Sequence, residues 1–150
     1  MTGTVQTHNE AQIRRLMDDK ATAMRARDAE TLVAQYAPDA VDFDLAPPLQ
    51  KTGQEVRDLA GLKSWFSGFA GDIDFEVRDL SVTTSEDVAY CHSLHRLTAT
   101  PFGAPDSFTL WFRSTVCLRR VDGSWLISHE HSSTPFYMDG SFKAAVDLQP

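Results

Sequence analysis

Residues 107–133 read SFTLWFRSTVCLRRVDGSWLISHEHSS, two long strand-like runs that meet at Asp122-Gly123. An Asp-Gly pair supplies the positive φ angles that tight hairpins require, so this stretch predicts a β-hairpin. Two further strands are predicted before it, over residues 73–82 and 88–100. The apolar side chains change phase between Val77 and Leu80, which indicates a bulge near Arg78 or Asp79. The second half of the chain is therefore predicted to be a meander of long strands.

Helices are predicted in the first half of the chain. The segment Thr7-His8-Asn9-Glu10 is a capping box that marks a helix start, and an apolar stripe at helical spacing follows it. Shorter helices are predicted over residues 29–36 and 54–69, with a first strand over 41–45. Helices followed by a strand meander form an α+β pattern, so we expect a bent sheet folded over the helices with a cavity at one end. We expect a single domain over residues 1–150, with 1–7 a flexible start and 137–150 a C-terminal tail.

Composition excludes several classes of function. The chain has 150 residues, with 14 basic and 21 acidic side chains and a net charge of −7, which argues against nucleic acid as a partner. No apolar run is long enough to cross a membrane, and the first ten residues lack a signal pattern, so we expect a cytoplasmic protein. The two cysteines, Cys91 and Cys117, lie in strand-like segments and are expected to be free thiols. Motifs for nucleotide binding, hydrolase elbows and zincins are absent, and no organic cofactor is implied.

Lys20 is the most informative single residue. It lies within the apolar stripe of the first helix, where a charge is costly unless it is paired or reaches water. It therefore either snorkels, forms a structural ion pair, or presents a cation to the cavity that could stabilise an enolate or a carboxylate. Asp42 and Asp44 share a face of the first strand, and Asp44 is the expected partner of Lys20. The alternative for both aspartates is a solvated, acidic strand end.

The last strand carries two histidines. Alternation places Trp125, Ile127, His129 and His131 on one face, and the apolar pair predicts that this face points inward. If the same holds for the face that carries His92 and for the face that carries Trp111 and Arg113, then His92, Arg113, His129 and His131 could converge with Asp44 and Lys20. Hydrogen-bonded core histidines and a buried Arg113 ion pair are the alternatives. His-x-His supplies only two metal ligands, and His92 or Asp44 would have to complete the set, so a metal site is the less favoured alternative and none is predicted. The aromatic residues Trp65, Trp111 and Tyr137 either line the pocket or belong to the core.

Two segments carry a family resemblance: Tyr36-Ala37-Pro38-Asp39-Ala40-Val41 and Trp125-Leu126-Ile127-Ser128-His129-Glu130-His131-Ser132-Ser133. With the order of elements, they resemble the nuclear transport factor 2-like superfamily, and most closely the bacterial SnoaL-like proteins of the ketosteroid isomerase group. The resemblance implies a cone-shaped α+β fold, in which a strongly curved, mixed or antiparallel sheet wraps around a long N-terminal helix. It also implies two further helices, an apolar pocket and a homodimer. A dimer through the outer sheet face would use the outward apolar residues Leu110, Phe112, Val116 and Leu118, if Trp111 faces inward.

The same resemblance assigns roles to individual residues. Asp44 matches the catalytic base of the isomerase branch, and Lys20 stands where that branch has a tyrosine. The protonated acid of that branch has no counterpart in residues 113–118. The leading hypothesis is a pocket for a small, apolar, carbonyl- or carboxylate-bearing molecule, with isomerisation, cyclisation or dehydration by proton abstraction. Asp44 would be the base, Lys20 or Arg113 the electrostatic stabiliser, and His131 a further catalytic candidate. The alternative is a non-catalytic dimerising or ligand-sensing module, which predicts a closed polar network without free volume.

Overall fold

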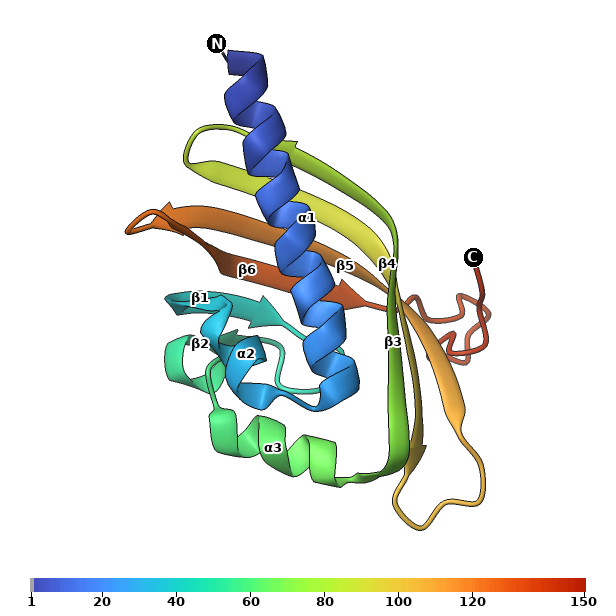
Figure 1. Ribbon diagram of the computed structural model, residues 1–150. Helices are drawn as coiled ribbons and strands as arrows, with labels where there is room; N and C mark the ends of the chain where they lie inside the picture. Colours follow the sequence, from blue (N-terminus) through green and yellow to red (C-terminus); the bar gives the residue numbers. More distant parts are fainter. Residues whose placement is uncertain (1) are drawn as a thin grey trace.

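A computed structural model describes residues 2–150 as three helices against one curved sheet (Figure 1). The elements in chain order are α1 (Thr2–Ala26), α2 (Ala29–Ala34), β1 (Tyr36–Phe43), β2 (Lys51–Thr52), the 3-10 turn η1 (Gly53–Glu55), α3 (Leu59–Ser67), β3 (Phe69–Thr84), β4 (Val88–Pro101), β5 (Phe108–Val121) and β6 (Ser124–Ser133). The strand order is β2-β1-β6-β5-β4-β3, and only the β1–β6 pairing among these is parallel. The long α1 lies across the sheet, and α2 and α3 lie toward one end. The predicted α+β class and mixed, curved sheet are confirmed.

Two backbone features that the sequence predicts are present. Asp122 and Gly123 have φ angles of 51° and 83°, as the hairpin between β5 and β6 requires. Asp79 has a φ angle of 56°, and the β3–β4 register shifts between Arg78 and Ser81. This bulge bends β3, so that one strand serves both the part of the sheet under α1 and the part beside α3.

Several predicted boundaries differ. Helix α1 begins by Thr2, and the Thr7 hydroxyl donates to the Gly3 carbonyl inside the helix instead of capping it. Residues 2–7 of the expected flexible start therefore belong to this helix, their flexibility stays a prediction, and Met1 lies outside the described residues. The predicted helix over 54–69 is divided into η1 and α3, because the Asp58 carboxylate caps a new helix by accepting from the Gly61 amide. The predicted tail is partly attached: Phe136 bridges to Ala144, and Ala145 is buried.

The core has two parts that follow the length of α1. Ile13 and Met17 pack on the inner faces of β4, β5 and β6, which supply Cys91, Val116, Leu118 and Ile127. Farther along the helix, Ala21 and Ala23 pack near Phe66, Phe75 and Leu97. Both cysteines are free, as predicted, and burial raises the pKa of the Cys91 thiol to about 12. The predicted basis for a dimer is wrong: Val116 and Leu118 belong to this core, and Leu110 and Phe112 line a cavity. Association of two copies stays a prediction.

Strand β6 contains a bulge that the sequence does not signal. Cys117 pairs with His129 and Leu118 with Ile127, so Ser128 has no partner of its own on β5. The bulge reverses the alternation of side chains along the strand. Trp125 and Ile127 are buried before it, and Glu130 is the buried residue after it. This single extra residue decides which polar side chain of β6 enters the interior.

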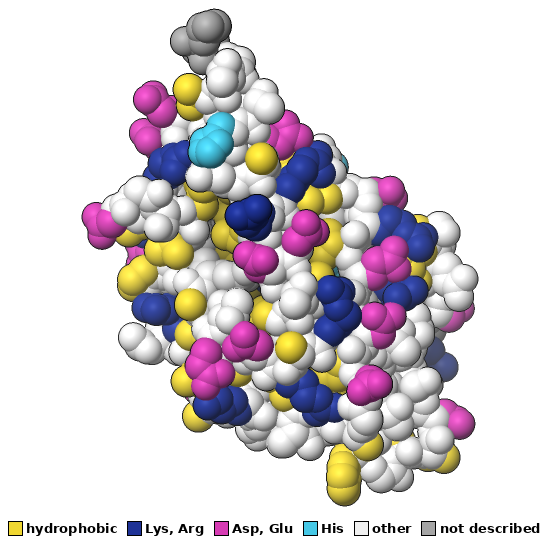
Figure 2. Space-filling model, viewed as in Figure 1, with side chains coloured by type: hydrophobic (Ala, Val, Ile, Leu, Met, Phe, Trp, Pro, Cys, Tyr) yellow, Lys and Arg dark blue, Asp and Glu magenta, His cyan; other side chains and the backbone are white. Residues whose placement is uncertain are grey.

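The outer surface mixes charges of both signs. On the face that carries α1, Figure 2 shows acidic and basic side chains interspersed over the helix and its surroundings. None of the helices within residues 2–150 combines the length and the apolar character needed to cross a membrane.

Candidate functional site

A cavity of about 690 Å³ lies between α1, β1, α3 and the inner face of the sheet. Its walls combine aliphatic side chains with six aromatic ones: Tyr36, Trp65, Phe69, Phe75, Phe108 and Phe112. Its ionisable residues occupy two places, a buried group contributed by α1, β1, β4 and β6, and a more exposed group contributed by the β1–β2 connection, β2, η1 and the N-cap of α3. The cavity therefore offers an apolar space with ionisable groups at defined positions, which is the usual build of a small-molecule site.

The buried group is centred on Lys20, Tyr36 and Glu130. The Lys20 ammonium donates to both Glu130 carboxylate oxygens, at 2.7 and 2.9 Å, and to the Tyr36 hydroxyl at 3.1 Å. The Tyr36 hydroxyl in turn donates to Glu130. Burial opposes ionisation of Glu130, but the charge and hydrogen bonds of Lys20 and the bond from Tyr36 outweigh it and lower the pKa of this carboxyl. The Tyr36 pKa is raised well above its usual value by burial and by the Glu130 charge.

Lys20 thus has a partner, but a different one from the predicted partner. An ammonium has three N–H donors, and all three are used by Glu130 and Tyr36. Asp44 is instead half-exposed and lies 3.6 Å from the Lys51 ammonium. The predicted pairing of Lys20 with Asp44 is therefore wrong, because the β6 bulge brings Glu130 to the place where a partner was needed.

Asp42 is the lining carboxyl with the most unusual environment. It pairs in register with Glu130 on the parallel strand β6, and both side chains line the cavity. Burial, with a smaller contribution from the Glu130 charge, raises the pKa of Asp42 to about 7. Near neutral pH, its carboxyl is therefore present in both the protonated and the ionised form, which is what a general acid or base needs.

His95 contributes a neutral imidazole to the cavity. It is 1% exposed and lies on the inner face of β4, with its Nε2 atom 3.0 Å from the Ser93 hydroxyl oxygen. Burial lowers the pKa of His95 to about 4, and the Lys20 charge acts in the same direction. A neutral imidazole can both donate and accept a hydrogen bond.

The structure brings only some of the predicted residues together. Lys20, Asp42, Asp44 and Trp65 line the cavity. The expected convergence of the other residues does not occur: His92, Arg113, His129, His131, Trp111 and Tyr137 are not among its lining residues.

The strand phases explain these errors. On β4, the inner set includes Ala89, Cys91, Ser93 and His95, so His92 is exposed on the outer face. On β5, Ser114 is buried, so Arg113 is exposed and its Nε donates to the Ser133 hydroxyl. Trp111 shares that outer face, with the Arg78 guanidinium 4.6 Å from its ring centre.

The remaining predicted residues have other partners. After the β6 bulge, His131 is exposed, and His129 is held by a 2.7 Å hydrogen bond between its Nδ1 atom and the Val41 carbonyl. Tyr137 lies in the C-terminal segment, where its hydroxyl donates to Asp147. Within residues 2–150, no three His, Cys, Asp or Glu side chains are grouped closely enough to hold a metal ion.

Sequence reasoning missed Tyr36, His95 and Glu130. Tyr36 was interpreted as an apolar residue of the second helix, but it begins β1. Glu130 was placed on the outer face by strict alternation. One available signal is that Glu130 is the only acidic residue of β6, opposite the one lysine that interrupts the α1 stripe.

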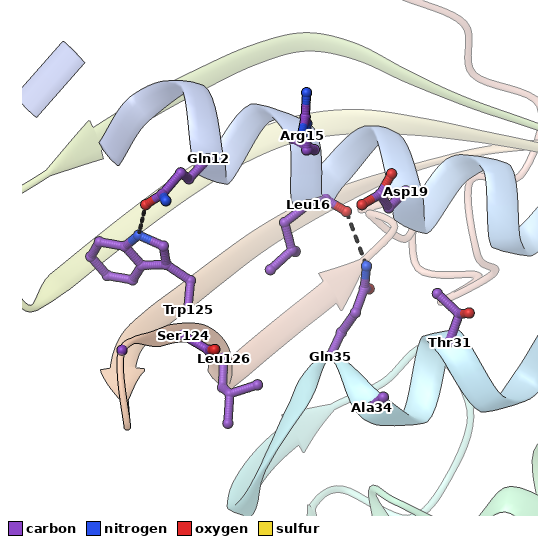
Figure 3. Close-up of a pocket in the computed structure, with 11 residues that line it drawn as sticks. Gln12, Arg15, Leu16, Asp19, Thr31, Ala34, Gln35, Ser124, Trp125 and Leu126 are labelled. Atoms are coloured by element: carbon purple, nitrogen blue, oxygen red, sulfur yellow. Dashed lines mark hydrogen bonds between the residues drawn. The ribbon is translucent and has the colours of Figure 1, made fainter. Parts of the chain in front are cut away.

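A second hollow, of about 590 Å³, lies between α1, α2 and the start of β6 (Figure 3). Two hydrogen bonds cross it: the Trp125 indole donates to the Gln12 side chain at 2.9 Å, and the Gln35 side chain donates to the Leu16 carbonyl at 3.0 Å. These bonds connect α1 to β6 and α2, so the polar groups of this hollow serve the packing of the helices.

Comparison with known proteins identifies the class to which this fold and cavity belong. The SnoaL-like domain matches residues 13–137, and the chain therefore belongs to the SnoaL-like family. No curated protein sequence matches the chain. Among solved structures, a nuclear transport factor 2-like protein of unknown function from Pseudomonas putida KT2440 is similar, with 35% identity and a TM-score of 0.83. That match covers 96% of this chain and 98% of the other.

Two more distant structures share the fold. A protein named as a proposed scytalone dehydratase from Novosphingobium aromaticivorans DSM 12444 has 18% identity and a TM-score of 0.76, over 95% of this chain and 97% of its own. A ketosteroid isomerase-like protein from Erwinia carotovora atroseptica SCRI1043 has 23% identity and a TM-score of 0.67, over 82% and 93%. The predicted nuclear transport factor 2-like, SnoaL-like resemblance is confirmed.

Proposed function

We propose that this SnoaL-like protein is an enzyme that moves a proton next to a carbonyl group of a small apolar molecule. The reaction class includes isomerisation, cyclisation and dehydration. The observation that carries the proposal is the Asp42 carboxyl, which lines an aromatic cavity beside Glu130 and has a pKa raised to about 7. The names of two structural relatives, a proposed dehydratase and an isomerase-like protein, are in keeping with this reaction class.

Asp42 replaces Asp44 as the proposed base. The ionised Asp42 carboxylate would accept the proton from the carbon beside the carbonyl, and the electron pair of the C–H bond would move toward the carbonyl oxygen. Asp42 could then return the proton at a second carbon or release it. Asp44 is less suited, because its carboxylate is exposed and lies near Lys51 at the open end of the cavity.

The negative charge that develops on the carbonyl oxygen needs a donor. Lys20 was expected to supply it, but its three N–H groups are already used by Glu130 and Tyr36. His95 is the better candidate, since it lines the cavity and its imidazole is neutral at pH 7. Lys20 and Tyr36 would act by holding Glu130 ionised beside Asp42. The Glu130 charge raises the Asp42 pKa, and the direct charge of Lys20 acts in the opposite direction.

The test is proton exchange with a simple ketone. The ketone 2-tetralone, incubated in deuterium oxide, exchanges the hydrogens next to its carbonyl, and NMR measures the rate. We expect the protein to accelerate this exchange above buffer, with a rate that rises with pH up to about 7 as Asp42 ionises. Asp42→Asn should remove the acceleration. Asp44→Asn is the matched control, since it makes the same change two residues along the strand and should retain most of the rate.

A non-catalytic binding module is the second candidate. The closed Lys20–Tyr36–Glu130 network favours it, although the open volume beside that network does not. Equal exchange rates for the wild type, Asp42→Asn and buffer would reject catalysis by Asp42 and leave the binding role.

A further inference from the structure

The cavity wall has more negative than positive side chains. Among the described residues that line it, the cations are Lys20 and Lys51, and the carboxylates are Asp42, Asp44, Glu55, Asp58 and Glu130. The two cations are each within 4 Å of one carboxylate, Lys20 of Glu130 and Lys51 of Asp44. The other three carboxylates, Asp42, Glu55 and Asp58, form no ion pair with either lysine. Among these lining residues, no unpaired cation is therefore left for a ligand.

Two of these three carboxylates are fixed at the open end of the cavity. The Glu55 carboxylate accepts from the Thr52 backbone amide, at 3.3 Å, in the capping box of η1. The Asp58 carboxylate accepts from the Gly61 amide, at 3.0 Å, as the N-cap of α3. Both side chains belong to exposed residues, so a ligand that enters the cavity passes near their charges.

The aromatic wall acts in the same direction. Trp65, Phe69 and Phe108 form a chain of rings, with centres 4.9 Å apart for the first pair and 6.2 Å for the second. The face of an aromatic ring carries partial negative charge, so it attracts a cation and gives no favourable contact to an anion. A cleft with low-dielectric walls also focuses the field of the charges around it.

We infer that the cavity selects its ligand by charge: it takes an uncharged aromatic ketone or the corresponding ammonium compound, and it rejects the corresponding carboxylate. A carboxylate would lose its hydration and meet no free cation, because the N–H groups of Lys20 are used by Glu130 and Tyr36. This inference rests on the proposed function in one respect, namely that the cavity is the ligand site. It narrows the ligand class predicted from the sequence, which included carboxylate-bearing molecules.

Three naphthalenes of similar size test the selection: 2-acetonaphthone is uncharged, 2-naphthoate is an anion, and 2-naphthylmethylamine is a cation. Their dissociation constants are measured by calorimetry in low salt at about pH 7.5, where the three charges differ as intended. We expect the ketone and the ammonium compound to bind at least about tenfold more tightly than the naphthoate. High salt should reduce this difference, since the charges of Glu55 and Asp58 are exposed and can be screened.

The double variant Glu55→Gln/Asp58→Asn removes the two charges and keeps both caps, because glutamine serves in a capping box and asparagine serves as an N-cap. We expect the naphthoate to bind at least about threefold more tightly to this variant, with little change for the ketone. The matched control is Glu86→Gln/Asp87→Asn, which makes the same change of charge at the exposed β3–β4 turn, away from α3 (Figure 1). It should leave all three dissociation constants unchanged.

The outcomes separate this inference from the proposed function. Naphthoate binding as tight as ketone binding, or a naphthoate affinity that Glu55→Gln/Asp58→Asn leaves unchanged, overturns the selection by charge. Such a result can occur while 2-tetralone exchange still depends on Asp42. Conversely, selective binding without any exchange supports the charge rule and rejects the catalytic proposal. Failure of all three naphthalenes to bind overturns the inference and the ligand site together.

Discussion

The buried ion pair between Lys20 and Glu130 gives the sharpest prediction. The ammonium and the carboxylate are 2.7 Å apart, and their side chains are only 8% and 7% exposed. Lys20→Met leaves a buried carboxylate without its cation, and Glu130→Gln leaves a buried ammonium without its anion. Breaking a pair of this kind from one side costs about 3–5 kcal/mol of unfolding free energy, since the remaining charge is desolvated and unpaired. We therefore expect each single variant to lose about 3 kcal/mol or more.

The double variant separates a coupled pair from two independent residues. With both charges absent, no unpaired ion is left, so Lys20→Met/Glu130→Gln should lose no more than about 3 kcal/mol. Independent sites would give a loss of about 6 kcal/mol, the sum of the two single losses. Urea unfolding at neutral pH measures the four free energies, and the slope against urea shows whether the folded states stay comparable.

Lys51 and Asp44 supply a control pair in the same cavity. Their charged atoms are 3.6 Å apart, but the side chains are 31% and 41% exposed, so solvent screens the interaction. We expect Lys51→Met, Asp44→Asn and their combination to change stability by about 1 kcal/mol or less. Single losses below about 0.5 kcal/mol for both Lys20→Met and Glu130→Gln would refute the buried pair, because surface residues behave in that way.

Three further predictions concern titration and the backbone. Glu130→Gln should lower the pKa of Asp42 from about 7, and Lys20→Met should raise it, because Glu130 opposes and Lys20 favours the ionised form; a carboxyl NMR titration measures both. The raised pKa of Asp42 makes stability fall as pH rises from about 4 to 7, whereas the lowered pKa of His95 makes stability rise with pH from about 4 to 6.5. The two effects oppose each other. In Asp42→Asn the free energy of unfolding should therefore rise with pH between about 4 and 6.5, and in His95→Gln it should fall between about 4 and 7. The same dependence of this free energy on pH in both variants would contradict the prediction. Gly123→Ala should cost about 1 kcal/mol or more, since Gly123 has a φ angle of 83°. Ser124→Ala, at the next residue and first in β6, serves as the control in thermal unfolding.

Local chemistry explains why much of the fold could be predicted. The turn at Asp122-Gly123 depends on which residues tolerate positive φ, and this is a property of the residues themselves. The bulge near Asp79 was visible because the apolar side chains change phase between Val77 and Leu80. Lys20 was recognised as the charge within the apolar stripe because one helix has one period, and such a charge is visible without the rest of the molecule. Its burial in an ion pair is one of the alternatives that the sequence left open.

The strand faces could not be predicted with the same success, because both faces of β4 carry apolar residues. His92 shares its face with the large side chains Tyr90 and Leu94, and it would reach the cavity only if that face pointed inward. The observed inward face carries the small residues Ala89, Cys91 and Ser93, since α1 lies over this part of the strand and leaves little room. For this reason His92 lies on the outer face, whereas His95, for which no position was predicted, lies on the inner face.

The bulge at Ser128 could not be predicted from the sequence, for a different reason. It depends on the register between β5 and β6, and no glycine or other turn residue marks it. The bulge has a chemical consequence, because it turns Glu130 inward. The Glu130 carboxylate accepts two of the three hydrogen bonds that the Lys20 ammonium can donate, and the Tyr36 hydroxyl accepts the third. A free lysine would have lowered the pKa of every carboxyl nearby and favoured anionic ligands. Because Glu130 pairs with Lys20 and neutralises its charge, the pKa of Asp42 stays raised and the cavity wall has no unpaired cation for a ligand. The proposed base and the proposed selection by charge therefore both follow from the Lys20–Glu130 ion pair.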